Sequence, residues 1–319
     1  MNKMRYSPET YFHFSAFLNL YYSLEVSTGT IMEEYNEEYA EQMKKVFPEQ
    51  ILKKFKELHD KQRFSWKIKS CLFARISENK LKDSMFLLAN EFNDLLTDAF
   101  SYYQTYWKKI SPNLLRARKV LKKSKNELER LLAMISDLLQ ISWRIEELHV
   151  QLVDPFTGEP IGKNAISLGI GSIASLPSTD LTAISYFFIL HEATHILVWD
   201  SIRAMAEKYT TEEHAEYIDE AVMNLISNSI LKREDEFREK FWKAMKVANK
   251  MKFPPPSHLE KPETYEGEIY KARHEKRNRY ITYYRNLFQD DWEEMLAKNE
   301  PFSKVMENLL KRKMEKKGK

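Results

Sequence analysis

The stretch from Leu181 to Trp199 constrains the fold of this chain most strongly. It carries a single charged side chain, Glu192, although 30% of all residues in the chain are charged. A stretch of this length and composition is typical of a helix buried in a protein core. Because burying a lone carboxylate is costly, we expect partners that compensate the charge of Glu192. The sequence therefore predicts a buried helix with a polar centre.

Two histidines flank that carboxylate in the segment His191-Glu192-Ala193-Thr194-His195. Residues four apart lie on one face of a helix, so both imidazoles can bind the same metal ion. In a His-Glu-x-x-His helix the glutamate is placed to take a proton from a metal-activated water. We therefore predict one Zn²⁺ ion held by His191 and His195, with Glu192 as general base. Two histidines in an ordinary core helix are the alternative.

A catalytic zinc ion needs a third protein ligand and one position open to water. The extended pattern that ends in Gly-x-x-His is excluded, because Val198 and Ser201 stand at its glycine and histidine positions. The single cysteine, Cys71, lacks the neighbouring glycine of deformylase-type sites. A carboxylate on a following helix remains the best candidate.

The next segment predicts such a helix. Thr210-Thr211-Glu212-Glu213 fits a capping box with Thr210 as N-cap, and residues 221–231 carry no charge. Glu220 lies where the charged part of this helix meets its uncharged part, so we predict Glu220 as the third zinc ligand. Asn224, one turn further, shares the face of Glu220 and is predicted to hydrogen-bond a zinc-ligating imidazole.

Three other residues compete for the place of the third ligand. Glu216 is the second choice, since it also lies on this helix, but among charges. His214 belongs to the first turn, where solvent is its expected surrounding. Asp219 points about 100° away from Glu220 in an α-helix and so cannot share its face.

With these two segments the chain resembles the gluzincin group of zinc metallopeptidases. The matching pieces are His191–His195 and Asp219–Asn224, and the resemblance covers about residues 149–231. The group has Glu-x-x-x-Asp in the second piece, so Asn224 is a departure. The resemblance implies peptide-bond hydrolysis by a zinc site. It also implies a backing helix, a small sheet, an active-site helix and a glutamate helix, with one edge strand that holds the substrate as an extended peptide.

The segments before the motif agree with that layout. Residues 124–148 show the spacing of a long amphipathic helix. Two β-like runs, 149–153 and 165–171, are separated by the turn-rich stretch 154–160 and predict a hairpin or small sheet. We take 165–171 as the candidate edge strand for substrate, with Ile166, Leu168 and Gly169 as binding residues. A purely structural hairpin is the alternative.

The oxyanion of the reaction needs a further donor, which the motifs do not identify. Tyr217 is one candidate, and His258 and His274 are further candidates for substrate binding. Three more donors lie in the same C-terminal segment as these histidines: Tyr265, Tyr270 and Arg273.

Composition and the spacing of apolar residues predict the fold class and the division into regions. The 319 residues are expected to form a mainly α (α+β) protein, with a small sheet beside the active-site helix. We expect a helical N-terminal region (1–112), a zincin-like catalytic core (113–252) and a helical C-terminal region (257–319). Pro254-Pro255-Pro256 is expected to end the glutamate helix and mark the last connection.

Net charge and hydropathy bear on whether nucleic acid or a membrane is an expected partner. The net charge of +3 argues against nucleic acid as main partner. Residues 181–199 are long and apolar enough to cross a membrane, but a lone span could not enclose a zinc site, so no membrane span is expected. We find no secretory signal and expect a cytoplasmic protein.

The sequence thus predicts a zinc metallopeptidase that acts on a peptide or protein substrate. A helical binding protein with a vestigial or structural zinc site is the alternative from another class. A latent peptidase, whose N-terminal part covers the cleft, is a further alternative.

Overall fold

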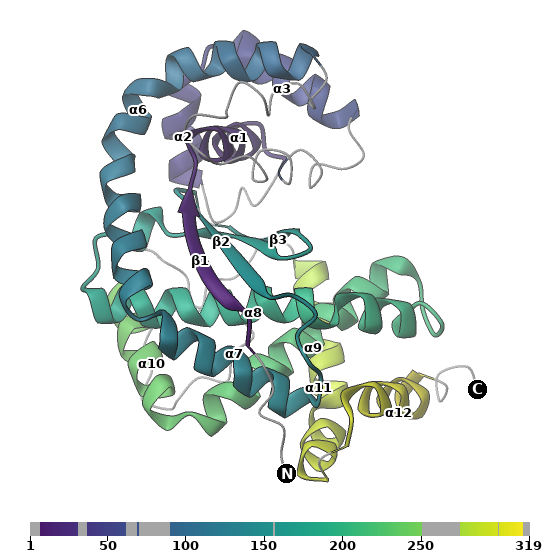
Figure 1. Ribbon diagram of the computed structural model, residues 1–319. Coiled ribbons are helices and arrows are strands. Elements are labelled where there is room, and N and C mark those ends of the chain that lie inside the picture. The colour runs from purple at the N-terminus through teal and green to yellow at the C-terminus, as the bar shows by residue number, and fades with distance from the viewer. Residues whose placement is uncertain are drawn as a thin grey trace. The chain divides into compact units, whose positions relative to one another are not determined.

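The computed structural model of the chain is mainly helical with a small mixed sheet, which confirms the fold class predicted from the sequence (Figure 1). The structure describes the following residues: 7–30, 37–61, 69, 90–155, 157–250, 275–298 and 300–314.

The chain forms two compact units, and each combines stretches that are far apart in the sequence. The first unit comprises residues 1–9, 125–147 and 186–319, and the second comprises 10–124 and 148–185. The division predicted from the sequence had three consecutive regions instead.

The first unit is built from helices and contains the His-Glu-x-x-His segment. Helix α8 begins in the second unit and continues into the first. The helices are α7 (Lys125–Leu139), α8 (Ser178–Ala206), α9 (Glu212–Arg233), α10 (Asp235–Asn249), α11 (Glu275–Ala297) and α12 (Phe302–Met314).

Helix α7 ends nine residues before the end predicted from the sequence. Its last turn closes when the Gln140 and Ile141 amides donate to the carbonyls of Asp137 (3.3 Å) and Ser136 (3.1 Å). Gln140 takes the left-handed conformation that this closure requires, with φ of 55°. Because glycine usually fills that position, the end of the helix at Leu139 is not recognisable from local residue patterns.

Helix α8 is the one helix in the described parts of the chain that is long and apolar enough to cross a membrane. Of its most apolar window, 78% is buried inside the structure. Burial of this extent also fits the core helix of a folded domain.

Helix α9 starts one residue later than predicted, with Thr211 as N-cap. The Thr211 hydroxyl accepts a hydrogen bond from the His214 amide (3.4 Å). The helix ends at Arg233, and α10 follows after Glu234, so the prediction of one helix up to the three prolines is wrong. Residues 254–256 lie outside the described residues.

Helix α11 packs along α9. The Trp292 indole donates to Ser229 Oγ (3.1 Å), and the Tyr284 hydroxyl lies 2.6 Å from His214 Nδ1. Trp292 and Tyr284 are both buried. Tyr284, in the middle of α11, thus contacts the first turn of α9, and Trp292, near the end of α11, contacts the last turns of α9.

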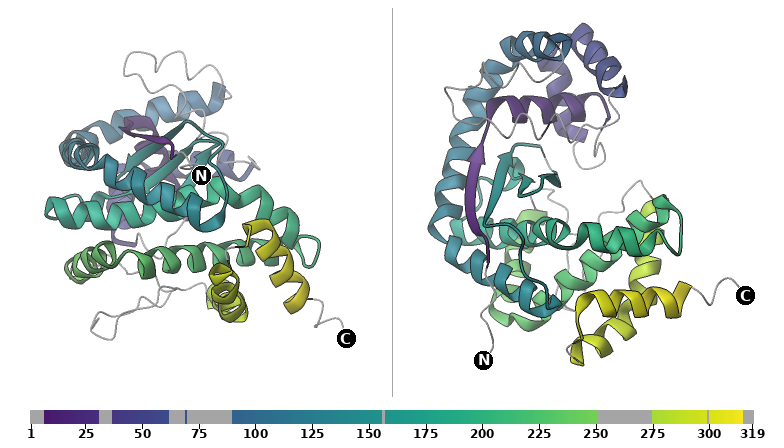
Figure 2. Two further views of the ribbon diagram at one scale, coloured as in Figure 1. Left: turned by 60° about the horizontal axis from the view of Figure 1, so that its bottom comes forward. Right: turned by 45° about the vertical axis from the view of Figure 1, so that its right-hand side comes forward.

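The second unit contains the sheet and the N-terminal helices. Figure 2 shows α1, α2 and α3 beside the long helix α6, against which they pack. The elements are β1 (Glu9–Phe14), α1 (Ala16–Ser27), α2 (Glu37–Val46), α3 (Glu49–Lys61), α6 (Asn90–Lys123), β2 (Glu147–Val153), β3 (Gly158–Gly162), β4 (Ala165–Gly169) and the short 3₁₀ helix η3 (Gly171–Ile173).

The strand order is β1-β2-β4-β3. Strands β2 and β4 are parallel, with Val150 opposite Ile166, whereas β3 and β4 are antiparallel, with Glu159 opposite Ser167. The small sheet was predicted correctly, but a hairpin of 149–153 with 165–171 is wrong. The predicted turn 154–160 overlaps the first residues of β3, whose Pro160 and terminal glycines hid the strand in the sequence.

Strand β4 lies inside the sheet, and its backbone pairs with β2 on one side and with β3 on the other. The prediction that 165–171 is an edge strand is therefore wrong. A central strand has no free edge to pair with an extended peptide. Ile166, Leu168 and Gly169 are buried in the second unit.

Helix α6 passes through Pro112 without a break, so the predicted boundary after residue 112 falls inside a helix. Proline removes one backbone hydrogen bond from a helix interior. The buried side chains of Ile110, Leu114, Ala117 and Leu121 recur at helical spacing on both sides of the proline. Continuous packing of this face outweighs the lost hydrogen bond.

A buried ion cluster joins α1 to β3. Lys69 Nζ lies 3.0 Å from Glu25 Oε2 and 2.6 Å from Glu159 Oε1, and the Tyr22 hydroxyl donates to Glu159 (2.8 Å). Lys69 is 1% exposed and Glu25 is fully buried. Because Lys69 contacts both carboxylates, it compensates the charge of the buried Glu25 and of Glu159, which is 31% exposed.

We expect Lys69→Met to destabilise the second unit strongly. The substitution takes the ammonium group away from the fully buried Glu25 carboxylate, which retains its contact with His59 Nε2 (3.3 Å), and from the partly exposed Glu159. The expected cost is about 3–5 kcal/mol in the free energy of unfolding. Urea titration followed by circular dichroism measures the change. The matched control is Lys44→Met, which removes a solvent-exposed ion pair with Glu41 and should leave stability nearly unchanged. Equal stability of the two variants would contradict the role of Lys69.

Candidate metal centre

Helix α8 places the two histidines of the motif on one face. His191 and His195 lie one turn apart, and their ring centroids are 5.2 Å from each other. Both are buried, with 8% and 3% of their surface exposed. Their environment is apolar on the flanking turns, because Ile189, Ala193 and Val198 are buried too.

Helix α9 brings Glu220 to the two imidazoles. Glu220 Oε2 lies 3.8 Å from His191 Nε2, and Oε1 lies 3.9 Å from His195 Nε2. One ligand atom from each residue lies within 4.8 Å of the other two. Zinc bonds of about 2.0–2.1 Å separate tetrahedral ligand atoms by about 3.4 Å, so small side-chain movements suffice to fit the ion. The structure thus brings together the three ligands predicted from the sequence.

Polar groups on α9 also lie at the outer nitrogen of each imidazole. His195 Nδ1 lies 3.0 Å from Asp219 Oδ2, and His191 Nδ1 lies 3.3 Å from Ser227 Oγ. Asp219 is 2% exposed. Zinc-ligating histidines typically donate their second N–H to a carboxylate or another oxygen, which fixes the ring and raises its basicity. This arrangement leaves both Nε2 atoms facing Glu220.

Asn224 does not have the role predicted for it. Asn224 is 1% exposed, and its amide has no hydrogen-bond partner in the described parts of the chain. Asp219 and Ser227 are the residues at the histidine nitrogens instead. The helical geometry that excluded Asp219 as a ligand carries its carboxylate to the far side of the His195 ring.

The charges around the site favour a bound cation. Burial lowers the pKa of His195, but Asp219, with smaller contributions from Glu220 and Glu192, raises it to about 9. Burial raises the pKa of Glu220, yet the neighbouring His191 and His195 hold that pKa well below its usual range. Carboxylates that favour a positively charged imidazole also favour a metal ion in the same place.

Glu192 follows His191 on α8 and is 7% exposed. Its negative charge contributes to the raised pKa of His195, so its carboxylate acts electrostatically on one of the candidate ligands. The position next to His191 is the one that the glutamate of a His-Glu-x-x-His helix has as general base.

Arg277 is a member of the site that sequence reasoning missed. Its guanidinium, on the first turn of α11, donates to Glu220 Oε1 (3.1 Å), and its Nε lies 3.8 Å from Glu216 Oε1. Fifty-seven residues separate Arg277 from Glu220. No local pattern links them, and the packing of α11 on α9 alone reveals the contact.

The remaining predicted site residues lie elsewhere. The Tyr217 hydroxyl donates to Glu213 (2.6 Å), which raises the pKa of Tyr217 to about 12, and its ring stacks on Tyr280. His214 Nδ1 contacts Tyr284, so His214 and Glu216 are engaged with α11. Five other candidates lie outside the described residues: His258, Tyr265, Tyr270, Arg273 and His274.

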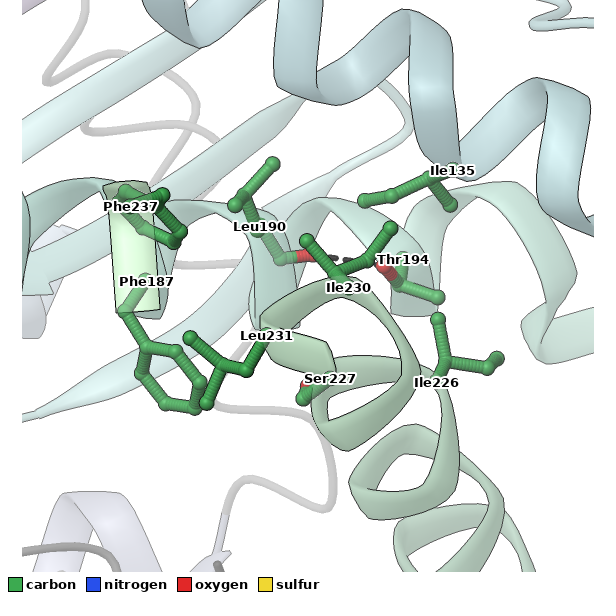
Figure 3. A pocket seen from close by; sticks show the side chains of 9 residues that line it. All are labelled: Ile135, Phe187, Leu190, Thr194, Ile226, Ser227, Ile230, Leu231 and Phe237. Atoms are coloured by element: carbon green, nitrogen blue, oxygen red, sulfur yellow. Dashed lines mark hydrogen bonds between the residues drawn. The ribbon is translucent and has the colours of Figure 1, made fainter. Parts of the chain in front are cut away.

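A small cavity lies between α8 and α9, with one side chain each from α7 and α10 in its lining (Figure 3). Leu190, Thr194, Ile226 and Ile230 contribute to its mainly apolar lining, and Ser227 contributes a hydroxyl. The Thr194 hydroxyl is engaged with the Leu190 carbonyl (2.6 Å). Because Glu192, His195 and Glu220 do not line this cavity, it belongs to the helix interface and is separate from the ligand face of the site.

Three comparisons with known proteins found no protein similar to this chain. No protein-family model matches the chain, and the searches of curated proteins and of solved structures gave no match. The candidate metal centre is therefore defined by the residues and geometry of this chain.

We expect Glu220→Gln to lose zinc. A neutral amide is a poor zinc ligand and removes the charge that balances the ion. Elemental analysis of the purified variant gives the zinc stoichiometry. The matched control is Glu216→Gln, one turn earlier on α9, which should keep its zinc. Loss of zinc from the Glu216 variant alone would move the third ligand by one helical turn.

We expect Asp219→Asn to weaken zinc binding about 10–100-fold, the usual size of an effect on a residue that orients a ligating histidine. The variant keeps the shape of the side chain but removes the charge next to His195. Competition with a chelator of known affinity measures the change. The control is Asp200→Asn, an exposed position on the same helix as the histidines. Unchanged affinity in Asp219→Asn would show that the 3.0 Å contact has no part in metal binding.

Proposed function

We propose that the protein is a zinc-dependent metallopeptidase with a ligand set of the gluzincin type. One observation carries the proposal: both Nε2 atoms converge with Glu220, while Asp219 and Ser227 lie at the outer nitrogens. Satisfied core histidines do not need a third, partly exposed carboxylate on their open side. A peptide or protein substrate and a cytoplasmic location stay predictions from the sequence.

The number of ligands favours catalysis over a structural role. Structural zinc sites are closed by four protein ligands, whereas catalytic sites use three and keep one position open. The group of His191, His195 and Glu220 offers three ligands among the described residues. Glu220 is 23% exposed, so the ligand face is open to solvent at this carboxylate.

Each residue has a distinct task in the proposed reaction. When bound, zinc supplies an activated water and polarises the scissile carbonyl. His191, His195 and Glu220 hold the ion, and Asp219 keeps the His195 ring oriented. Glu192 takes a proton from the attacking water and passes it to the leaving nitrogen. The water oxygen forms a bond to the carbonyl carbon, and the C–N bond breaks. The products are a carboxylate and an amine, and Glu192 is ionised again.

We expect Glu192→Gln to keep zinc and fold but to lower peptide hydrolysis by about two or more orders of magnitude, because glutamine cannot accept the proton. The assay is a peptide-library digest by zinc-saturated protein, analysed by mass spectrometry. Glu207→Gln, an exposed position just after α8, is the matched control and should stay fully active. Full activity of the Glu192 variant would remove Glu192 from the mechanism.

The same digest separates the proposed enzyme from the alternative class. Zinc-saturated wild-type protein that cleaves no peptide in the library contradicts the peptidase. Such a result, together with one tightly held zinc ion, favours a binding protein with a structural zinc site.

A further inference from the structure

Arg277 contacts a carboxylate oxygen of Glu220 that also faces His195. Its Nη2 lies 3.1 Å from Glu220 Oε1, and this same oxygen faces His195 Nε2 at 3.9 Å. A positively charged side chain is therefore in direct contact with one of the proposed ligands.

The contact lies on the exposed side of the site. Arg277 is 40% exposed and Glu220 is 23% exposed, whereas His195 and Asp219 on the inner side are 3% and 2% exposed. A substrate must approach from the exposed side, so it meets Arg277 as it reaches the ligands.

Arg277 is also held in place. It pairs with Glu216 and Glu220 on α9, and Tyr280, one turn further along α11, stacks on Tyr217 of α9. A cation on a well-packed helix is preorganised, and a preorganised donor loses little free energy to reorientation when charge develops next to it.

We propose that Arg277 is the anion-binding group of this centre and stabilises the negatively charged oxygen that develops on the scissile carbonyl. This role rests on the proposed function. As water attacks, the carbonyl π electrons move onto the oxygen, and Arg277 donates N–H hydrogen bonds to it without giving up a proton. A guanidinium has five N–H donors in a planar fork, so it can bind the Glu220 carboxylate and a second oxygen together.

A merely structural role is the competing explanation, because Arg277 bridges Glu216 and Glu220 and so joins α11 to α9. The two roles differ in one respect. An anion-binding residue changes the affinity of the zinc-loaded protein for a small oxyanion, whereas a structural ion pair changes stability alone.

The test compares zinc-saturated wild-type protein with Arg277→Gln, Arg277→Lys and the control Arg203→Gln. Arg203 is a similarly exposed arginine that pairs with Glu207 and Glu212. Zinc content is measured by elemental analysis, and inorganic phosphate binding is measured by calorimetry. The values of kcat and KM are measured on the best peptide from the library.

We expect Arg277→Gln to keep one zinc ion and to bind phosphate about tenfold or more weakly, because it loses hydrogen bonds from a charged donor. Its kcat should fall about 10²–10³-fold, as for removal of an oxyanion donor, with little change in KM. The phosphate affinity and kcat of Arg277→Lys should lie between those of the wild type and of Arg277→Gln, since lysine keeps the charge but not the planar fork of donors. Arg203→Gln should match the wild type.

Two results would overturn the role of Arg277. One is unchanged phosphate affinity and kcat in Arg277→Gln, and the other is a loss of activity that follows loss of zinc alone. If the glutamine variant does not fold, the lysine variant decides by the same criteria. Failure of the proposed function looks different, because zinc-saturated wild-type protein then hydrolyses no peptide. Phosphate binding needs no turnover and still tests Arg277 in that case.

Discussion

The burial of polar groups on α8 and α9 is the constraint on which the rest of the first unit depends. Helix α8 buries two imidazoles and the Glu192 carboxylate inside an apolar face, and α9 buries Asp219 and brings Glu220 to the same place. Neither helix could bury these groups by itself at an acceptable free energy. Packed together, the His195 imidazole lies between two carboxylates of α9, and the His191 imidazole lies between Glu220 and the Ser227 hydroxyl. Electrostatics therefore selects how these two helices pair, in addition to apolar packing.

Local patterns in the sequence were enough for the long buried helices and not for the order of the strands. The uncharged residues of 181–199 and 221–231 predicted α8 and α9 because charge is excluded wherever a helix is buried on most sides. The end of α7 was missed, since Gln140 adopts a conformation that usually marks glycine. The position of β4 between β2 and β3 was missed because parallel pairing joins segments that are not adjacent along the chain.

The residues of the candidate site also divide into those that local patterns predicted and those that they did not. His191, His195 and Glu220 were predicted because helical spacing and the edge of a charged segment are local properties. Asp219 was rejected as a ligand for a sound reason, but its position at the other side of the His195 ring depends on how α9 lies against α8. Ser227 gave no signal at all, as one of several small polar residues on a buried helix. These contacts follow from tertiary packing, which spacing alone does not encode.

The edge of the sheet has a consequence for the solubility of the protein. With β4 inside, β3 forms one border of the described sheet, and the register of β3 is irregular between Pro160 and Gly162. Proline has no backbone N–H, and an irregular register interrupts the regular row of hydrogen-bonding groups that a strand from another molecule would need. A border of this kind is a poor template for intermolecular strand pairing. The features that hid β3 in the sequence thus protect the folded chain against aggregation through that edge.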